Sequence, residues 1–399
     1  MSDEGGALTC RLARLLAVAC GVCVASLYYI QPLEAVVVNE FGISAGAAGI
    51  AATCAQLGYA AGLLLIVPLG DIIDRGRLIY LTMTVSVAAL VAVGIAPNFP
   101  VMAITLCVLG FGSVTPQLII PLAMHLAPQG KEGAVVGKML SGLLAGILLS
   151  RTFGGVVGEL AGWRSVFLLA AIAVLALALT IRRKLPAPPP HGGFPASSYR
   201  KMLASLPVLI RKFSDLRGAA VNGFLMFGAF SCFWGTVALH LAEPEIGLGA
   251  REAGLLGLTG IVGVLMASPI GRIGDRHGTA LPIGIGSAAS LLAYLVFFSF
   301  GGSVLGLTVG SVILDLGNQF GQVSNMARVQ ALGDDIRSRT DTVFMFSYFL
   351  GGSAGSAAGA MAFGALGWPS TCILGGSMAL LALLAHILHT HALHHDRRV

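Results

Sequence analysis

Three ionisable side chains lie inside long apolar stretches of the chain: Glu34, Arg151 and Asp315. A charge inside a bilayer costs free energy unless it is paired or wetted, so each of them is a candidate functional residue. An acid in such a place can bind and release protons, and a nearby cation favours its ionised form. Glu34 and Arg151 lie at similar depths, and we predict that they face each other as a pair. Asp315 is the competing proton carrier, and the alternative for the pair is a purely structural role.

A polar stripe surrounds Asp315 in the sequence. Its members are Asp315, Asn318, Gln322 and Asn325, with Gln319 beside them. Their steps of three, four and three residues place them on one face of a helix. Because a polar stripe should not face lipid, we predict that it lines a cavity. The alternative is that these side chains form hydrogen bonds between helices.

Further polar and aromatic side chains in other apolar stretches are candidates for the same cavity. They are Tyr28, Tyr29, Gln31, Gln56, Tyr59, Gln117, Asn222 and Trp234. Tyr28, Gln31 and Glu34 are three residues apart, which again favours one helix face. This mixture of amide, aromatic and carboxyl groups suits many ligands and does not identify one.

The composition describes the elements that must hold these residues. Of the residues, 56% are hydrophobic and 11% are charged, and the mean hydropathy is +0.87. A soluble domain is typically about a quarter charged, so the chain is expected to be a membrane protein that crosses the bilayer many times. No phosphate-binding loop and no motif for nucleophilic catalysis is evident, so neither ATP-driven transport nor enzyme activity is predicted. We expect no cofactor. We also expect no nucleic-acid partner, because the placement of basic residues in loops explains the net charge of +6.

Apolar runs of about 20 residues, the length that crosses a bilayer, predict twelve transmembrane helices. They fall near residues 14–38, 46–70, 78–97, 101–127, 134–159, 164–182, 218–242, 251–271, 280–300, 303–327, 341–366 and 370–390. The one long loop divides six helices from six. The expected domains are therefore residues 1–182, a linker at 183–217, and residues 218–399.

The linker combines two kinds of sequence. Four prolines between Pro186 and Pro190 predict an extended spacer. Residues 198–217 then mix apolar and basic side chains, which is typical of an amphipathic segment on the inner membrane surface. A loosely ordered linker is the alternative.

Basic residues predict the orientation of the chain. Nearly all of them fall in one alternating set of loops, whereas the opposite set contains only Arg164 and Arg251. Basic residues are enriched in cytoplasmic loops, so both termini are expected in the cytoplasm.

Two similar charged turns occur in the cytoplasmic set. The first contains Gly70, Asp71, Asp74, Arg75 and Arg77, and the second contains Gly271, Asp275 and Arg276. Asp74 and Asp275 are 201 residues apart, about half of the 399-residue chain. The spacing indicates an internal duplication. The alternative is that both are solvated turns that only follow the charge rule.

Six plus six helices with a duplicated Asp-Arg turn resemble the major facilitator superfamily. Several segments are similar to its bacterial proton-coupled exporters of drugs and metabolites: residues 27–33, 56–59, 68–71, 162–164 and 347–352. The resemblance implies two helical bundles around a central cavity that opens to alternate sides. It also implies that the charged turns form a cytoplasmic latch, which favours the outward-facing state.

The fifth predicted helix departs from the pattern of these exporters. Ser150 and Arg151 stand where they have Gly-Pro, and the fourth helix lacks the buried arginine common in proton-coupled relatives. Arg151 is therefore a candidate to replace that missing cation.

The resemblance implies a function: proton-coupled export of a small organic solute across the bacterial inner membrane, by a monomer. Proton-linked uptake of a metabolite is the alternative within transport, and a membrane receptor is the alternative outside it. No metal site is assigned. A metal-binding role for the histidine cluster at the C-terminus is the alternative to capping a helix. Its members are His386, His389, His391, His394 and His395.

Overall fold

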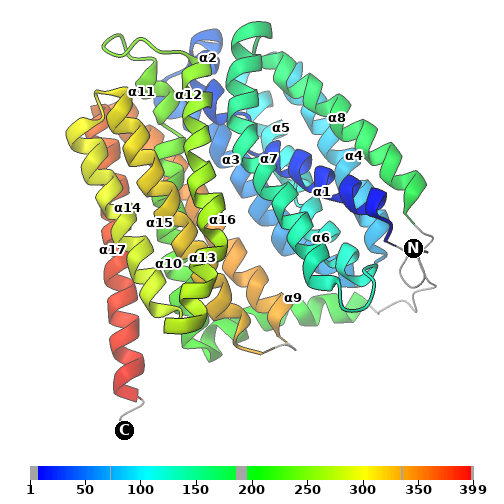
Figure 1. Cartoon of the computed structure of the whole chain (residues 1–399). Coiled ribbons are helices and arrows are strands. Elements are labelled where there is room, and N and C mark those ends of the chain that lie inside the picture. Colours follow the sequence, from blue (N-terminus) through cyan, green and yellow to red (C-terminus); the bar gives the residue numbers. More distant parts are fainter. Residues whose placement is uncertain (1–7, 72, 186–195, 334–335, 397–399) are drawn as a thin grey trace.

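A computed structural model describes residues 8–71, 73–185, 196–333 and 336–396, without the side chains of Asp71, residues 196–198 and residues 393–396. These residues are almost entirely helical, and no β-strand occurs among them. Figure 1 shows two groups of long helices side by side.

The first half of the chain holds ten helical elements. They are α1 (Cys10–Ala25), η1 (Gln31–Leu33), α2 (Glu34–Phe41), α3 (Ala45–Leu65), η2 (Val67–Asp71), α4 (Arg75–Gly94), α5 (Phe99–Gly112), α6 (Thr115–His125), α7 (Glu132–Ala161) and α8 (Trp163–Lys184). Short polar side chains begin several of them: Ser44, Asp74 and Asn98 accept hydrogen bonds from the first-turn amides of α3, α4 and α5.

The connecting segment and the second half hold the remaining elements. They are α9 (Ala196–Lys212), α10 (Ser214–Trp234), α11 (Val237–Leu241), α12 (Ala250–Leu256), η3 (Gly257–Gly260), α13 (Ile261–His277), α14 (Ala280–Phe300), α15 (Val304–Gln330), α16 (Arg337–Leu366) and α17 (Trp368–Asp396). Several expected membrane crossings consist of two consecutive elements, such as α5 with α6, and α12 with α13.

Among the described residues, ten helical segments are long and apolar enough to span a membrane. The two other predicted crossings are also helical, but one is interrupted by a turn and the other is less apolar. The expected helix 14–38 is broken by a turn at residues 26–30, so α1 leads into η1 and α2. The expected helix 303–327 is α15, in which the polar stripe lowers the hydropathy. The all-helical membrane fold with twelve crossings is therefore confirmed.

The two halves touch closely at one end, which we call the α2 end. Added Cβ atoms show how close they are: one on Gly155 of α7 would lie 2.2 Å from the carbonyl oxygen of Ala250 in α12. One on Gly49 of α3 would lie 2.2 Å from Cβ of Ala360 in α16. The hydroxyl of Thr152 also donates to the carbonyl oxygen of Gly254, at 3.0 Å. Backbone contact through small residues is a common way for membrane helices to pack.

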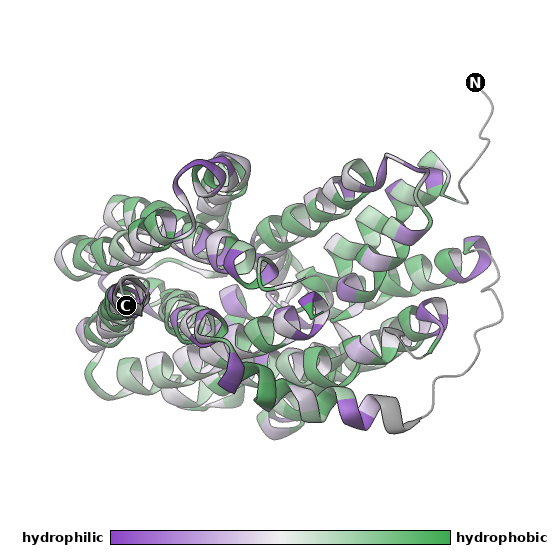
Figure 2. Ribbon diagram, turned by 90° about the horizontal axis from the view of Figure 1, so that it is seen from below, coloured by the Kyte–Doolittle hydropathy of each residue, from purple (hydrophilic) through white to green (hydrophobic). Residues whose placement is uncertain are grey.

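The halves diverge toward the opposite end, which we call the α9 end (Figure 1). No atom lies within 4 Å of a Cβ built on Gly137 of α7 or Gly271 of α13, so neither glycine packs against a neighbouring helix. Figure 2, seen from this end, shows apolar residues along the helices and polar residues gathered at helix ends and in loops.

Helix α9 connects the halves at that end. Its Leu206 and Leu209 are buried, and its Tyr199 hydroxyl donates to the carbonyl oxygen of Leu65 in α3, at 2.8 Å. Arg339 of α16 donates to Ser205 at 3.4 Å. The segment is thus a helix with a buried apolar side rather than a loose linker. The proline-rich spacer lies outside the described residues.

Candidate functional site

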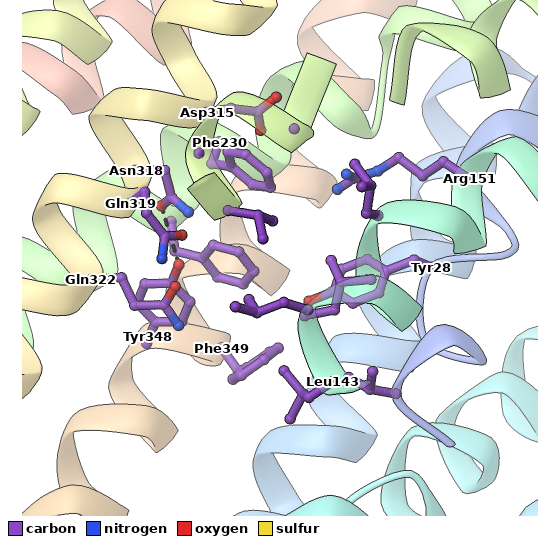
Figure 3. Close-up of a pocket in the computed structure, with 18 of the residues that line it drawn as sticks. Tyr28, Leu143, Arg151, Phe230, Asp315, Asn318, Gln319, Gln322, Tyr348 and Phe349 are labelled. Atoms are coloured by element: carbon purple, nitrogen blue, oxygen red, sulfur yellow. Dashed lines mark hydrogen bonds between the residues drawn. The ribbon is translucent and has the colours of Figure 1, made fainter. Parts of the chain in front are cut away.

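A cavity of about 120 Å³ lies between the two halves. Polar and aromatic residues from both halves form its wall (Figure 3): Tyr28, Tyr59, Gln117, Arg151, Phe227, Phe230, Asp315, Asn318, Gln319, Gln322, Tyr348 and Phe349. Aliphatic residues of α7, among them Leu143 and Ile147, complete the wall on the side of the first half.

Arg151 of α7 is the cation of the cavity and is only 3% exposed. Its Nε donates a hydrogen bond of 2.8 Å to Oε1 of Gln31. Its guanidinium lies over the indole ring of Trp234, with 4.0 Å between Cζ and the ring centroid, and lies 5.3 Å from the Tyr28 ring. An aromatic face attracts a cation and can replace part of its hydration. One element from each half thus helps to hold the charge.

Asp315 of α15 is the acid of the cavity and is 7% exposed. Its Oδ2 accepts a hydrogen bond of 3.1 Å from the hydroxyl of Thr259 in η3. Gly260 and Gly263 lie against it, so the helix pair α13 and α15 approaches closely there. Asp315 and Arg151 attract each other electrostatically across the cavity. Figure 3 shows them on opposite walls.

The predicted pair of Glu34 and Arg151 is wrong in this structure. Glu34 is 1% exposed, but neither of its carboxyl oxygens has a hydrogen-bond partner. Gln31 occupies the position beside the guanidinium instead. The prediction assumed one continuous helix, whereas the turn at residues 26–30 and the 3-10 helix η1, which contains Pro32, change the direction of the Glu34 side chain.

The polar stripe of α15 divides into two parts. Asn318 and Gln322 lie in the cavity wall with Asp315, and Oδ1 of Asn318 accepts a hydrogen bond of 3.1 Å from the Tyr348 hydroxyl. Asn325 does not line the cavity. Its Nδ2 donates to Oδ1 of Asn222 at 2.7 Å, and therefore links α15 to α10. Part of the stripe therefore lines the cavity, as predicted, and part forms a hydrogen bond between helices, as the alternative predicted.

Among the other predicted cavity residues, three line the cavity: Tyr28, Tyr59 and Gln117. Nε2 of Gln117 donates to the Tyr59 hydroxyl at 3.3 Å.

Five predicted cavity residues lie elsewhere: Tyr29, Gln31, Gln56, Asn222 and Trp234. Gln31 and Trp234 contact Arg151 but do not line the cavity themselves. Gln56 donates to the Ser356 hydroxyl at 3.2 Å and so joins α3 to α16 where the halves meet. Tyr29 packs against Phe153 of α7, with 5.5 Å between ring centroids. Asn222 bonds to Asn325 as described above. These five side chains contact neighbouring helices or Arg151 rather than line the cavity.

Sequence reasoning missed an aromatic side of the cavity. Phe227 stacks on Tyr348 with 4.0 Å between ring centroids, and Tyr59 packs on Phe349 at 4.3 Å. Phe230 lies 5.6 Å from Phe227. Phe227 and Phe230 are three residues apart on one expected helix, and that spacing was the available signal.

The first charged turn is built around a helix cap. Oδ1 of Asp74 accepts a hydrogen bond of 2.8 Å from the backbone N–H of Arg77, so Asp74 begins α4. Nε of Arg75 donates to the carbonyl oxygen of Gly70 at 3.1 Å. A Cβ on Gly70 would lie 3.1 Å from the Leu118 side chain of α6, so a larger residue there would require Leu118 to shift slightly. The side chain of Asp71 lies outside the described residues.

The second charged turn has a different backbone. Asp275 and Arg276 lie within α13, which continues to His277, and Gly271 packs against nothing. A latch that joins the halves through these residues therefore stays a prediction. For metals, no group of three or more His, Cys, Asp or Glu residues in the described part of the chain could hold an ion. The His394 and His395 side chains lie outside it.

Outside the membrane-spanning segments, Glu40 anchors the α2 end of the first half. It accepts hydrogen bonds from Trp163 and Arg164 at the start of α8. Burial acts to raise the pKa of Glu40, but these hydrogen bonds and the positive charge of Arg164 outweigh it and lower the pKa below the usual 4.5.

Comparisons with known proteins agree with this fold. The Major Facilitator Superfamily model matches residues 16–355. "Uncharacterized transporter YgaY" of Escherichia coli O157:H7 is 36% identical over 384 residues, which are 96% of this chain and 97% of the relative. "Probable transporter SCO4007" of Streptomyces coelicolor is 31% identical over 378 residues, which are 93% of this chain and 86% of the relative.

Two solved structures have the same fold at low sequence identity. A POT family transporter in complex with a thioalcohol conjugated peptide gives a TM-score of 0.76 at 16% identity, covering 96% of each chain. A bacterial homolog of the human lysosomal transporter Spinster, in an inward-facing and occupied conformation, gives 0.73 at 13% identity, also covering 96% of each chain. At these identities the likeness shows the fold alone.

Proposed function

Because the chain belongs to the major facilitator superfamily and its relatives are described as transporters, we propose that it exports a small organic solute across the bacterial inner membrane in exchange for protons. The transport unit in this proposal is one chain. Its two moving parts are residues 1–182 and 218–399, joined by a linker at 183–217 that contains α9.

The placement of Arg151 and Asp315 is the observation that carries this proposal. One residue comes from each half, both line the same cavity, and they attract each other across it. A ligand changes the balance between two conformations only if it binds them differently. A charge pair that spans the moving interface gives a proton or a polar solute such a difference.

The proposed cycle begins with Asp315 ionised. Its attraction to Arg151 then favours the arrangement in which the halves meet at the α2 end. Proton binding removes the negative charge, whereas Arg151 stays charged because a guanidinium is not deprotonated in proteins. The attraction is lost, so the halves are no longer held in the arrangement that is closed at the α2 end.

Glu34 is the second proton site in this proposal. A buried carboxylate without a hydrogen-bond partner is costly, so the neutral acid fits the surroundings of Glu34. Opening of the α2 end would admit water to Glu34 and allow its proton to exchange.

The charge distribution supports an inward-facing assignment for this arrangement. Most arginines and lysines lie in the loops at the α9 end, which is also the end where the halves diverge. By the positive-inside rule that end faces the cytoplasm, and the α2 end is closed toward the outside.

The cavity wall suggests the kind of solute. Stacked aromatic rings favour a planar or apolar part, and the amides of Asn318, Gln319 and Gln322 favour groups that exchange hydrogen bonds.

The test is transport by the purified protein in proteoliposomes. A panel of organic solutes is added under an imposed pH gradient, and proton movement is recorded for each. We expect at least one solute to drive proton movement in the opposite direction, and Asp315→Asn to abolish this coupling. Undiminished coupling in both Asp315→Asn and Glu34→Gln would reject the mechanism. Solute and protons moving together would replace export by the alternative, proton-linked uptake.

A further inference from the structure

Two opposite charges line the central cavity without touching each other. Arg151 belongs to α7 in the first half, and Asp315 belongs to α15 in the second half. They attract each other, but no salt bridge joins them in the described part of the chain. Figure 3 shows them on opposite walls. A solute in the cavity can therefore contact both charges at once.

The guanidinium of Arg151 has few hydrogen bonds. Its Nε donates to Gln31, whereas neither terminal nitrogen donates to another described residue. Nη2 is buried, so Nη1 is the nitrogen that a solute in the cavity can meet. The side chains in contact with the guanidinium, such as Gln31 and Trp234, are uncharged. A buried cation without an acid in contact is costly, and a carboxylate is a strong partner for arginine.

The carboxyl group of Asp315 can also accept a further partner. Its Oδ2 accepts one hydrogen bond, from the hydroxyl of Thr259. An ionised carboxylate has about four acceptor sites, so a donor from the solute can still bind. With Asp315 ionised, as at the start of the proposed cycle, an ammonium group supplies both a donor and the opposite charge.

The two charges together disfavour a solute that carries only one charge. A cation at Asp315 is repelled by Arg151, and an anion at Arg151 is repelled by Asp315. Such interactions are stronger in a buried site than in water. A solute with a carboxylate and an ammonium group is instead attracted on both sides, and it leaves neither side chain unpaired.

The rest of the wall and the cavity volume restrict the remaining part of the solute. Phe227 and Tyr348 stack with 4.0 Å between ring centroids, and Phe230 and Phe349 line the same cavity. Aromatic side chains favour an apolar or aromatic group beside them. The volume of about 120 Å³ is below the roughly 300 Å³ at which pockets for drug-sized ligands begin, so a small solute fits better.

We propose that the solute is a zwitterionic amino acid with an aromatic side chain, bound with its carboxylate at Arg151, its ammonium group at Asp315 and its ring beside the aromatic wall. One carbon atom separates the two charged groups of an amino acid, which suits two protein charges that attract each other without contact. This inference rests on the proposed export function and names its solute class. A proton and the ammonium group then compete for Asp315, so the binding of one favours the release of the other.

The experiment compares three ligands that share one ring. Phenylalanine carries both charges, phenylethylamine carries only the ammonium group, and phenylpropionate carries only the carboxylate. Isothermal titration calorimetry measures their binding to the purified full-length protein in detergent at neutral pH. We expect phenylalanine to bind about tenfold or more tightly than either analogue, the size expected for hydrogen bonds to a charged group. Equal affinity of the wild type for phenylalanine and one of the analogues would overturn the proposal.

Two variants should change the three affinities in a crossed pattern. Arg151→Gln should weaken phenylalanine and phenylpropionate by about tenfold and leave phenylethylamine bound at least as tightly as before. Asp315→Asn should weaken phenylalanine and phenylethylamine and spare phenylpropionate. Arg182→Gln is the matched control, because Arg182 lies over the Tyr80 ring on the exterior, and all three affinities should stay at their wild-type values. Variants that change the three affinities equally would contradict the assigned contacts.

Proton movement in proteoliposomes separates this inference from the proposed function. Phenylalanine that shows the crossed pattern but drives no proton movement would reject exchange with protons and support the binding site. Proton movement that is driven only by solutes with a single charge would support exchange and overturn the zwitterion.

Discussion

At the scale of single residues, the geometry around Arg151 explains why an arginine suits this position. The guanidinium uses its edge to donate to Gln31 and its flat face to lie over Trp234. A lysine ammonium is a compact point charge that cannot do both in the same way. A substitution that keeps the positive charge at this position therefore tests whether charge alone is enough for function.

We expect Arg151→Lys to lower the transport rate in proteoliposomes by about tenfold or more, because a hydrogen bond from a charged donor contributes roughly 1.5–3 kcal/mol. Arg182→Lys is the matched control. Arg182 also lies over an aromatic ring, 4.6 Å from the Tyr80 centroid, but on the exterior, and should transport normally when changed. Wild-type rates in Arg151→Lys would show that only the charge matters.

Glu40 gives a prediction for pH. Its folded pKa is lowered, so its contribution to stability is present above the usual value of 4.5 and is lost as the pH falls through the folded pKa. We expect Glu40→Gln to lower the melting temperature at neutral pH, with the difference from wild type disappearing in acid. The effect should be modest, because the carboxyl is partly exposed and solvent weakens its ion pair with Arg164.

Thermal unfolding in detergent, recorded at several pH values, measures this difference. Glu245→Gln is the control, because Glu245 is an exposed acid at the same end of the protein. A loss of stability in Glu40→Gln that is the same at all pH values would contradict the explanation.

At the scale of helices, contact between α7 and α12 holds the α2 end closed. Gly155, Ala250 and Gly254 let the two backbones meet, and a Cβ at position 155 would lie 2.2 Å from a backbone oxygen. A backbone atom cannot move aside as a flexible side chain can, so even one methyl group should force these helices apart.

We therefore expect Gly155→Ala to shift the population toward an arrangement open at the α2 end and to lower transport several-fold. Distances between spin labels on α7 and α12 would report the shift. Gly137→Ala on the same helix is the control, because a Cβ there meets nothing within 4 Å. Unchanged distances in Gly155→Ala would mean that the contact does not hold this end closed.

The helices also show what a sequence can and cannot predict. Residues 280–300 were predicted from an apolar run between turn residues, and α14 spans Ala280–Phe300. The side-chain pairing of Glu34 failed because hydropathy does not reveal a turn inside an apolar run. Asn325 failed as a cavity residue because helical spacing gives the face but not the neighbour, and its neighbour is Asn222.

At the scale of the whole molecule, the orientation in the membrane decides which compartment the open cavity faces. The direction of net transport is set by the gradients and by the coupling between solute and protons. In the orientation that we propose from the positive-inside rule, the α9 end faces the cytoplasm, and Cys10 at the start of α1 belongs to that end. Cys10 is also exposed, whereas the other cysteines are buried or partly buried.

A membrane-impermeant maleimide should therefore label the wild-type protein in inverted membrane vesicles but not in intact spheroplasts. The variant Cys10→Ser should lose this labelling, which would assign it to that residue. Adding Glu245→Cys to Cys10→Ser places a thiol at the exposed α2 end and should reverse the pattern, with labelling in spheroplasts only.

If both thiols react from the sides opposite to these, the α9 end faces outward, and the open cavity would then face the outside of the cell. Such a result would leave the fold and the charge pair across the cavity intact. It would make this arrangement outward-facing rather than inward-facing.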